Sequence, residues 1–83
     1  MIVRANVMFL GCKQESFKGK NGDNIQFQRV CFMPEYGDEP MKLTALNSLD
    51  FSNIDKCADL VLEFDFSTDQ RTGYLKGKIV GIE

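Results

Sequence analysis

The sequence contains no histidine and no tryptophan, and only two of its 83 residues are proline. Without histidine, Ser-His-Asp and Cys-His catalysis cannot be built, and most zinc and iron sites lose their usual ligand. Cys12, Cys31 and Cys57 are odd in number and widely spaced, which fits neither a disulfide framework nor a paired-cysteine zinc site. We therefore expect a protein that is not an enzyme, needs no cofactor or metal, and keeps its thiols free.

Long hydrophobic runs are also missing. No apolar run reaches the roughly 18 residues that a membrane-spanning helix needs, and the first residues lack the basic segment and cleavage site of a signal peptide. The chain is nevertheless 43% apolar and only 27% charged, which is typical of a folded protein. We expect one cytoplasmic domain over residues 1–83 with no membrane partner.

Apolar and polar residues alternate along most of the chain, as in half-buried β-strands. The alternation predicts strands over residues 2–13, 25–33, 41–46, 57–66 and 74–82. In the first run the apolar phase changes after Phe9, so a bend or bulge is expected at Gly11. In the fourth run Leu62 and Phe64 should face the core while Glu63 faces water, and we interpret the acidic outer side as solvation rather than a metal site.

The stretch over residues 47–56 breaks the alternation and carries capping residues, so it predicts a short helix or helical turn. Three strands, a short helical segment and two further strands predict an all-β fold, a five-stranded OB-like Greek-key barrel. An SH3-like barrel of similar length is the alternative.

Barrels of the OB type usually bind ligands on their second and third strands, between the loops that join strands one to two and four to five. Here both loops combine cations with an aromatic residue, which suits single-stranded nucleic acid because cations follow the phosphates while rings stack on bases. The candidate contacts from these loops and the adjoining strands are Arg4, Phe17, Lys18, Lys20, Gln26, Gln28, Arg71, Tyr74, Lys76 and Lys78.

The net charge is −2, so nucleic-acid binding requires a locally basic face. Eight of the ten basic residues belong to these two loops and their strands, and most acidic residues lie elsewhere. The basic group is Arg4, Lys13, Lys18, Lys20, Arg29, Arg71, Lys76 and Lys78. Each lysine alone is equally typical of an ordinary soluble surface, so the grouping carries the prediction.

The chain combines a Met-Ile start to a long first strand, a basic loop from Lys18 to Gly22, the Ile25-Gln26-Phe27-Gln28 opening of the second strand, and a glycine-aromatic turn into the last one. In these features it resembles the small single-stranded-DNA-binding, helix-destabilising proteins of filamentous phages and related mobile elements. It implies an OB-like barrel that acts as a homodimer and coats single strands cooperatively. By position, it assigns DNA contacts to Lys18, Lys20, Arg71 and Tyr74.

These observations predict a sequence-tolerant single-stranded-DNA-binding protein that protects strands during replication or transfer of a phage or mobile element. The preference between DNA and RNA stays open. The alternative is a protein-interaction module, an inhibitor or assembly subunit whose acidic surface meets a basic partner.

Overall fold

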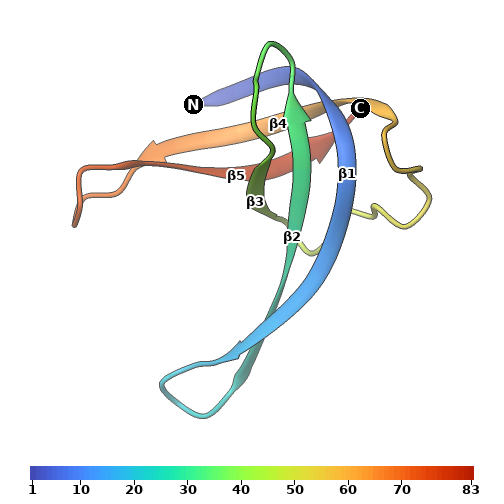
Figure 1. Cartoon of the computed structure of the whole chain (residues 1–83). Coiled ribbons are helices and arrows are strands. Elements are labelled where there is room, and N and C mark those ends of the chain that lie inside the picture. The colour runs from blue at the N-terminus through green and yellow to red at the C-terminus, as the bar shows by residue number, and fades with distance from the viewer.

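The computed structural model describes residues 1–83, which form five β-strands and no helix. The strands are β1 (Ile2–Lys18), β2 (Asn24–Pro34), β3 (Met41–Ala45), β4 (Asp59–Thr68) and β5 (Leu75–Ile82). They form a closed barrel in the order β1-β2-β3-β5-β4 (Figure 1). Every neighbouring pair is antiparallel except β3 and β5, which are parallel. The predicted all-β, five-stranded architecture is confirmed, and no helix able to span a membrane is present.

Strand β1 is long enough to pair with two neighbours. Its first half, Ile2 to Met8, pairs with β4, and the part from Val7 to Lys18 pairs with β2. The β1–β2 register shifts between Phe9 and Gly11, which confirms the predicted break. Because Leu10 is the extra residue there, the strand can bend around the barrel.

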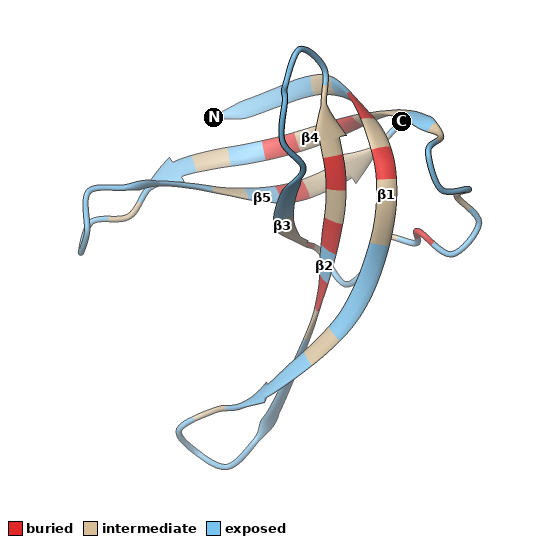
Figure 2. Cartoon of the chain, viewed as in Figure 1, coloured by how far each residue is buried: buried red, intermediate tan, exposed pale blue.

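The core lies inside the barrel and draws on all five strands (Figure 2). Its buried residues are Val7, Phe9, Val30, Phe32, Ala45, Phe51, Leu62, Phe64 and Ile79. The inward side predicted for the fourth run is confirmed, since Leu62 and Phe64 are buried while Leu60 and Phe66 pack against them partly exposed. Gly77 allows β5 to pack closely against the Phe66 ring of β4, because a Cβ atom at this position would lie 2.6 Å from that ring.

The connection between β3 and β4 contains turns instead of the predicted helix. Short polar side chains compete with helical backbone hydrogen bonds here. Asp50 accepts hydrogen bonds from the Ser52 backbone nitrogen at 2.9 Å and from its hydroxyl at 2.6 Å. Phe51 still closes one end of the barrel, because its ring stacks on Phe9 with centroids 5.9 Å apart.

Two hairpins extend from the barrel (Figure 1). The β1–β2 hairpin continues to the pair Lys18–Asn24, five residues beyond the predicted end of the first strand, and we call residues 13–29 the arm. The β4–β5 hairpin continues to the pair Thr68–Leu75. Residues at both hairpin ends are mostly exposed (Figure 2). Few apolar contacts hold these ends, so they are shaped mainly by backbone pairing.

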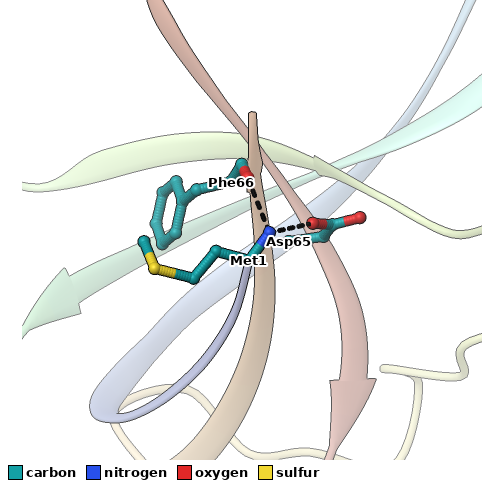
Figure 3. A network of polar contacts seen from close by, with 3 residues as sticks. All are labelled: Met1, Asp65 and Phe66. Atoms are coloured by element: carbon teal, nitrogen blue, oxygen red, sulfur yellow. Dashed lines mark hydrogen bonds and ion pairs between the residues drawn. The ribbon is translucent and has the colours of Figure 1, made fainter. Parts of the chain in front are cut away.

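The start of β1 is fastened to β4 by polar contacts (Figure 3). The Met1 amino group lies 3.2 Å from Asp65 Oδ1 and donates to the Phe66 carbonyl oxygen at 3.0 Å. The Phe66 backbone nitrogen donates in return to the Met1 carbonyl oxygen at 2.8 Å. These contacts extend the β1–β4 pairing, which runs from Ile2–Asp65 to Met8–Asp59, by one residue at its end.

Candidate nucleic-acid interface

A row of paired positions crosses the outer surface of four strands. Lys13 of β1 pairs with Arg29 of β2, which pairs with Thr44 of β3, which pairs with Lys78 of β5. Paired residues share a face of the sheet, and successive residues alternate between faces. The residues next to this row in β2, β3 and β5 are Val30, Ala45 and Ile79, and all three are buried. The row therefore points outward, and three of its four members are cations.

Few carboxylates neutralise these cations. Arg29 Nη1 lies 3.6 Å from Glu15 Oε2, and its guanidinium sits 5.5 Å from the Phe27 ring centroid. Lys13 and Lys78 form no ion pair. Lys76, two residues from Lys78 on the same face of β5, forms none either. This part of a net-negative chain is therefore locally positive.

The arm adds aromatic surface on the same outer face. Phe17 pairs with Ile25, and Glu15 pairs with Phe27, so these side chains follow Lys13 and Arg29 toward the tip. The Phe17 and Phe27 rings meet edge to face with centroids 5.8 Å apart. Phe17 is 53% exposed, which leaves its ring able to stack on a base.

The tip of the arm carries two further cations. Lys18 is the last residue of β1, on the face opposite to Phe17, and Lys20 lies in the turn. The turn is closed by a hydrogen bond from the Gly19 nitrogen to the Asp23 carbonyl oxygen at 2.8 Å. Gly22 takes the positive φ of 81° that the turn requires. Both lysines are exposed and form no ion pair.

The β4–β5 hairpin presents Arg71 and Tyr74. Its turn is built by the Asp69 carboxylate, which accepts from the Arg71 backbone nitrogen at 2.8 Å, and by Gly73, whose φ is 75°. Tyr74 precedes β5 by one residue and is 76% exposed. The ring and the nearby cation are therefore accessible, as the sequence predicted.

Gln28 requires a correction, because it is buried and cannot contact a ligand outside the barrel. Its side-chain nitrogen donates to the carbonyl oxygens of Leu46 and Leu49 at 2.6 and 2.8 Å. Its position pairs with Ala45, which is also buried, so the side chain points inward. Gln26, two residues earlier on the same face, lies beyond the barrel and is exposed.

Arg4 lies apart from the other predicted cations. It lies in the half of β1 that pairs with β4, where its guanidinium is 3.3 Å from Glu63 and 3.1 Å from Glu83. Two carboxylates compensate its charge, and the structure does not place it with the cations of the arm. It therefore belongs to the acidic part of the surface.

This interface includes Lys13, Phe27 and Arg29, which were not among the contacts predicted from the sequence. Lys13 and Arg29 were recognised as basic but are 16 positions apart, and only the β1–β2 register places them opposite each other. Phe27 follows the alternation of a core residue, but it lies on the arm, where no strand covers it. Only the register of β1 against β2 shows that Lys13, Phe27 and Arg29 lie together.

Partial burial raises the pKa of the Cys12 thiol above its ordinary value of 9.0, so Cys12 is a weak nucleophile near neutral pH. No group of three or more potential metal-ligating side chains is present. Binding through charge and aromatic rings is the chemistry that this surface supports.

Comparison with known proteins identifies no relative: the chain matches no family model, no curated protein and no solved structure.

Proposed function

We propose that the chain is a non-catalytic protein that binds single-stranded DNA with little sequence preference. The observation that carries this proposal is the outward row of Lys13, Arg29, Thr44 and Lys78, which lies between two hairpins bearing exposed rings. Cations bind the phosphates of any sequence, and every base offers a face for stacking. Such a surface favours single strands because their bases are free to stack.

The topology supports an OB-like assignment. The strand order is β1-β2-β3-β5-β4. The first three strands follow one another in antiparallel pairs, β4 lies beside β1, and β5 lies between β3 and β4. OB barrels bind oligonucleotides on the face of strands two and three, between the same two hairpin loops. The lack of a helix between β3 and β4 leaves this face unchanged, because that connection covers one end of the barrel.

The positive and negative charges lie on different parts of the surface, so a chain with a net charge of −2 can still present a basic face to a nucleic acid. Of the ten Lys and Arg residues, Arg4 and Arg29 form ion pairs and the other eight form none. The contacts between Arg4, Glu63 and Glu83 lie on another part of the barrel. An approaching strand therefore meets the local positive field of the row and the arm.

The biological role follows the resemblance of the sequence. We propose that the protein acts in the cytoplasm as a homodimer and coats strands during replication or transfer of a phage or mobile element. Fluorescence polarisation with labelled oligo-dT, oligo-rU and duplex DNA across a salt series tests the binding. We expect micromolar or tighter binding to oligo-dT that weakens with salt, and weaker binding to the duplex. Absence of saturable binding at about 50 mM salt would overturn the proposal.

A second candidate function is supported by an acidic hollow of about 610 Å³ along β1 and β4. Its walls combine the carboxylates of Glu35, Asp59 and Glu83 with apolar side chains, including Met33 and Leu60. This combination suits a basic segment of a partner protein with apolar residues between its cations. If oligo-dT does not bind, titration with a lysine- and leucine-containing peptide should give binding that is lost in Glu35→Gln/Asp59→Asn.

A further inference from the structure

A second hollow, of about 450 Å³, lies on the outer face where β1, β2 and β3 meet the connection that leads into β4. Its charged lining consists of Lys13, Glu15, Arg29, Lys42 and Lys56. Lys13 and Arg29 belong to the row described above. Lys42 and Lys56 were not part of the basic group recognised from the sequence. We call this hollow, with its four basic lining residues, the cationic hollow.

Backbone hydrogen bonds at the β1 bulge place Lys56 beside the strands. The Phe9 nitrogen donates to the Ala58 carbonyl oxygen at 2.8 Å, and the Cys57 nitrogen donates to the Phe9 carbonyl oxygen at 2.6 Å. Cys57 takes a φ of 68°, which turns the chain immediately after Lys56. Lys42 reaches the same place from β3, where it pairs with Cys31, a lining residue. Four separate segments therefore supply the four cations.

The charges in the cationic hollow are poorly balanced. Glu15 is its only carboxylate, and it forms one ion pair, with Arg29 at 3.6 Å. Lys13, Lys42 and Lys56 have no ion pair. Lys13 and Arg29 are like charges at directly paired positions, an arrangement that destabilises a sheet. Departures from local stability rules are expected where a surface serves binding, and a bound anion would remove this repulsion.

The lining also indicates which part of a nucleic acid fits. The hollow contains no aromatic side chain, so it offers a base no stacking surface. Its volume lies within the roughly 300–1,000 Å³ of pockets that bind small ligands, and an arginine fork with several lysines suits phosphate oxygens. The exposed ring of Phe17 and the half-buried ring of Phe27 lie beyond it along the arm.

We propose that the cationic hollow is the phosphate subsite of this protein, which holds backbone phosphates while adjacent bases stack on Phe17 and Phe27. This inference rests on the proposed function, because it assigns a place to the strand on the same surface. The strand then runs lengthwise along the outer face of the arm. Glu15 competes with the phosphates for Arg29, so neutralising Glu15 strengthens binding.

The test compares Lys42→Gln, Lys56→Gln and their double variant with wild type by oligo-dT titration at several salt concentrations. Arg4→Gln is the control matched in charge, because it also removes one positive charge but lies outside the hollow. Each hollow substitution should weaken binding about five- to tenfold at about 50 mM salt and reduce the salt slope by about 0.7, the contribution of one phosphate contact on a single strand. Arg4→Gln should change affinity less than about twofold. Glu15→Gln should bind more tightly than wild type, and thermal melts check that all variants are folded.

A second probe separates this inference from the proposed function. Inorganic pyrophosphate is titrated into ¹⁵N-labelled wild-type protein and the Lys42→Gln/Lys56→Gln variant. Saturable shifts of the Lys13, Arg29 and Lys42 amides in wild type alone support a phosphate subsite even if oligo-dT does not bind, in which case its ligand is a free phosphate. Oligo-dT binding that is unaffected by both lysine substitutions overturns the subsite and leaves the proposed function standing. Absence of both oligo-dT binding and pyrophosphate shifts overturns both.

Discussion

The side-chain nitrogen of Gln28 donates a hydrogen bond to the carbonyl oxygen of Leu46 over 2.6 Å. The same nitrogen donates to Leu49 at 2.8 Å, and the Gln28 oxygen accepts from Gln14 at 3.1 Å. Gln28 is the buried polar side chain of this barrel, and no buried side-chain nitrogen or oxygen lacks a partner. These bonds attach the connection between β3 and β4 to β2, which compensates for the absence of a helix in that connection.

Replacing Gln28 should therefore destabilise the fold. Gln28→Ala leaves the Leu49 carbonyl oxygen without a donor, and the Leu46 carbonyl oxygen keeps only its hydrogen bond from the Leu49 backbone nitrogen. We expect the free energy of unfolding to fall by about 1–3 kcal/mol. Gln26→Ala is the matched control, because Gln26 is exposed on the same strand, and it should change stability by less than about 0.5 kcal/mol. Urea denaturation measures both values. Equal stability of the two variants would show that the buried hydrogen bonds contribute nothing.

Phe64 should contribute strongly to the core. It is 4% exposed, and its ring lies 5.5 Å from the Phe32 ring and 5.8 Å from the Phe66 ring, centroid to centroid. Phe64→Ala should cost about 3–5 kcal/mol and leave a domain of this size largely unfolded. Phe17→Ala, on the arm, should cost only about 0.5–1.5 kcal/mol through the lost edge contact with Phe27. Circular dichroism melts that rank the two variants in the opposite order would contradict the assigned core.

Asp50 should make the stability of the connection between β3 and β4 depend on pH. Hydrogen bonds from the Ser52 hydroxyl and backbone nitrogen hold the pKa of its carboxyl below the ordinary value of 3.8. Because the folded-state pKa is the lower one, this stabilisation is fully present above pH 3.8 and is lost as the pH falls through the folded-state pKa. NMR titration of the Asp50 carboxyl carbon should give a midpoint below 3.8 that moves upward in Ser52→Ala. An unchanged midpoint would rule out this cause.

The strands could be predicted because a strand with one buried face alternates apolar and polar residues, as β4 does around the buried Leu62 and Phe64. The arm could not be predicted to its full length, since residues 14–18 are held by hairpin pairing and have no buried face. The segment over residues 47–56, predicted as a short helix or helical turn, contains turns and no helix, because Asp50 forms a turn with Ser52 instead of capping a helix. Local turn chemistry decided this segment, and its packing through Phe51 required no helix.

The candidate site could be predicted only where it lies in local loops. Lys20, Arg71 and Tyr74 lie within two residues of a turn glycine, Gly22 or Gly73, and turns bring such residues to the surface. The cationic hollow depends instead on pairings far apart in the sequence: Lys42 is placed by the β2–β3 register, and Lys56 by hydrogen bonds to Phe9. Composition and spacing contain no information on these pairings.

The cysteines can report on the bound strand. Cys12 and Cys31 line the cationic hollow, whereas Cys57 is exposed and is not part of its lining. Saturating oligo-dT should slow iodoacetamide labelling of Cys12 and Cys31 but leave Cys57 nearly unchanged, as measured by mass spectrometry. Cys57 is the internal control for the reagent. Equal protection of all three thiols would point to global tightening or aggregation instead of local coverage.

The same labelling should show a dependence on pH at Cys12. Thiolate is the reactive form, and partial burial raises the Cys12 pKa above 9.0. Labelling of Cys12 in the free protein should therefore be slow near neutral pH and continue to accelerate above pH 9.0. The footprint experiment is best performed at the highest pH at which oligo-dT still binds.

Tyr74 tests whether stacking and charge contribute separately to binding. Its ring is 76% exposed, one residue before β5 and three after Arg71. If a base stacks on the ring, Tyr74→Phe keeps the aromatic face and retains most of the affinity. Tyr74→Ala should lose about 1–3 kcal/mol of binding free energy with an unchanged salt slope, because no phosphate contact is removed.

Arg71→Ala should have the complementary effect. A lost phosphate contact reduces the salt slope by about 0.7 and weakens binding chiefly at low salt. Oligo-dT titrations at several salt concentrations separate the two effects, and thermal melts check that both variants are folded. If Tyr74→Ala binds as tightly as wild type, the β4–β5 hairpin offers no stacking surface and the aromatic contacts are confined to Phe17 and Phe27 on the arm. If it instead changes the salt slope as Arg71→Ala does, Tyr74 acts by positioning the cation rather than by stacking on a base.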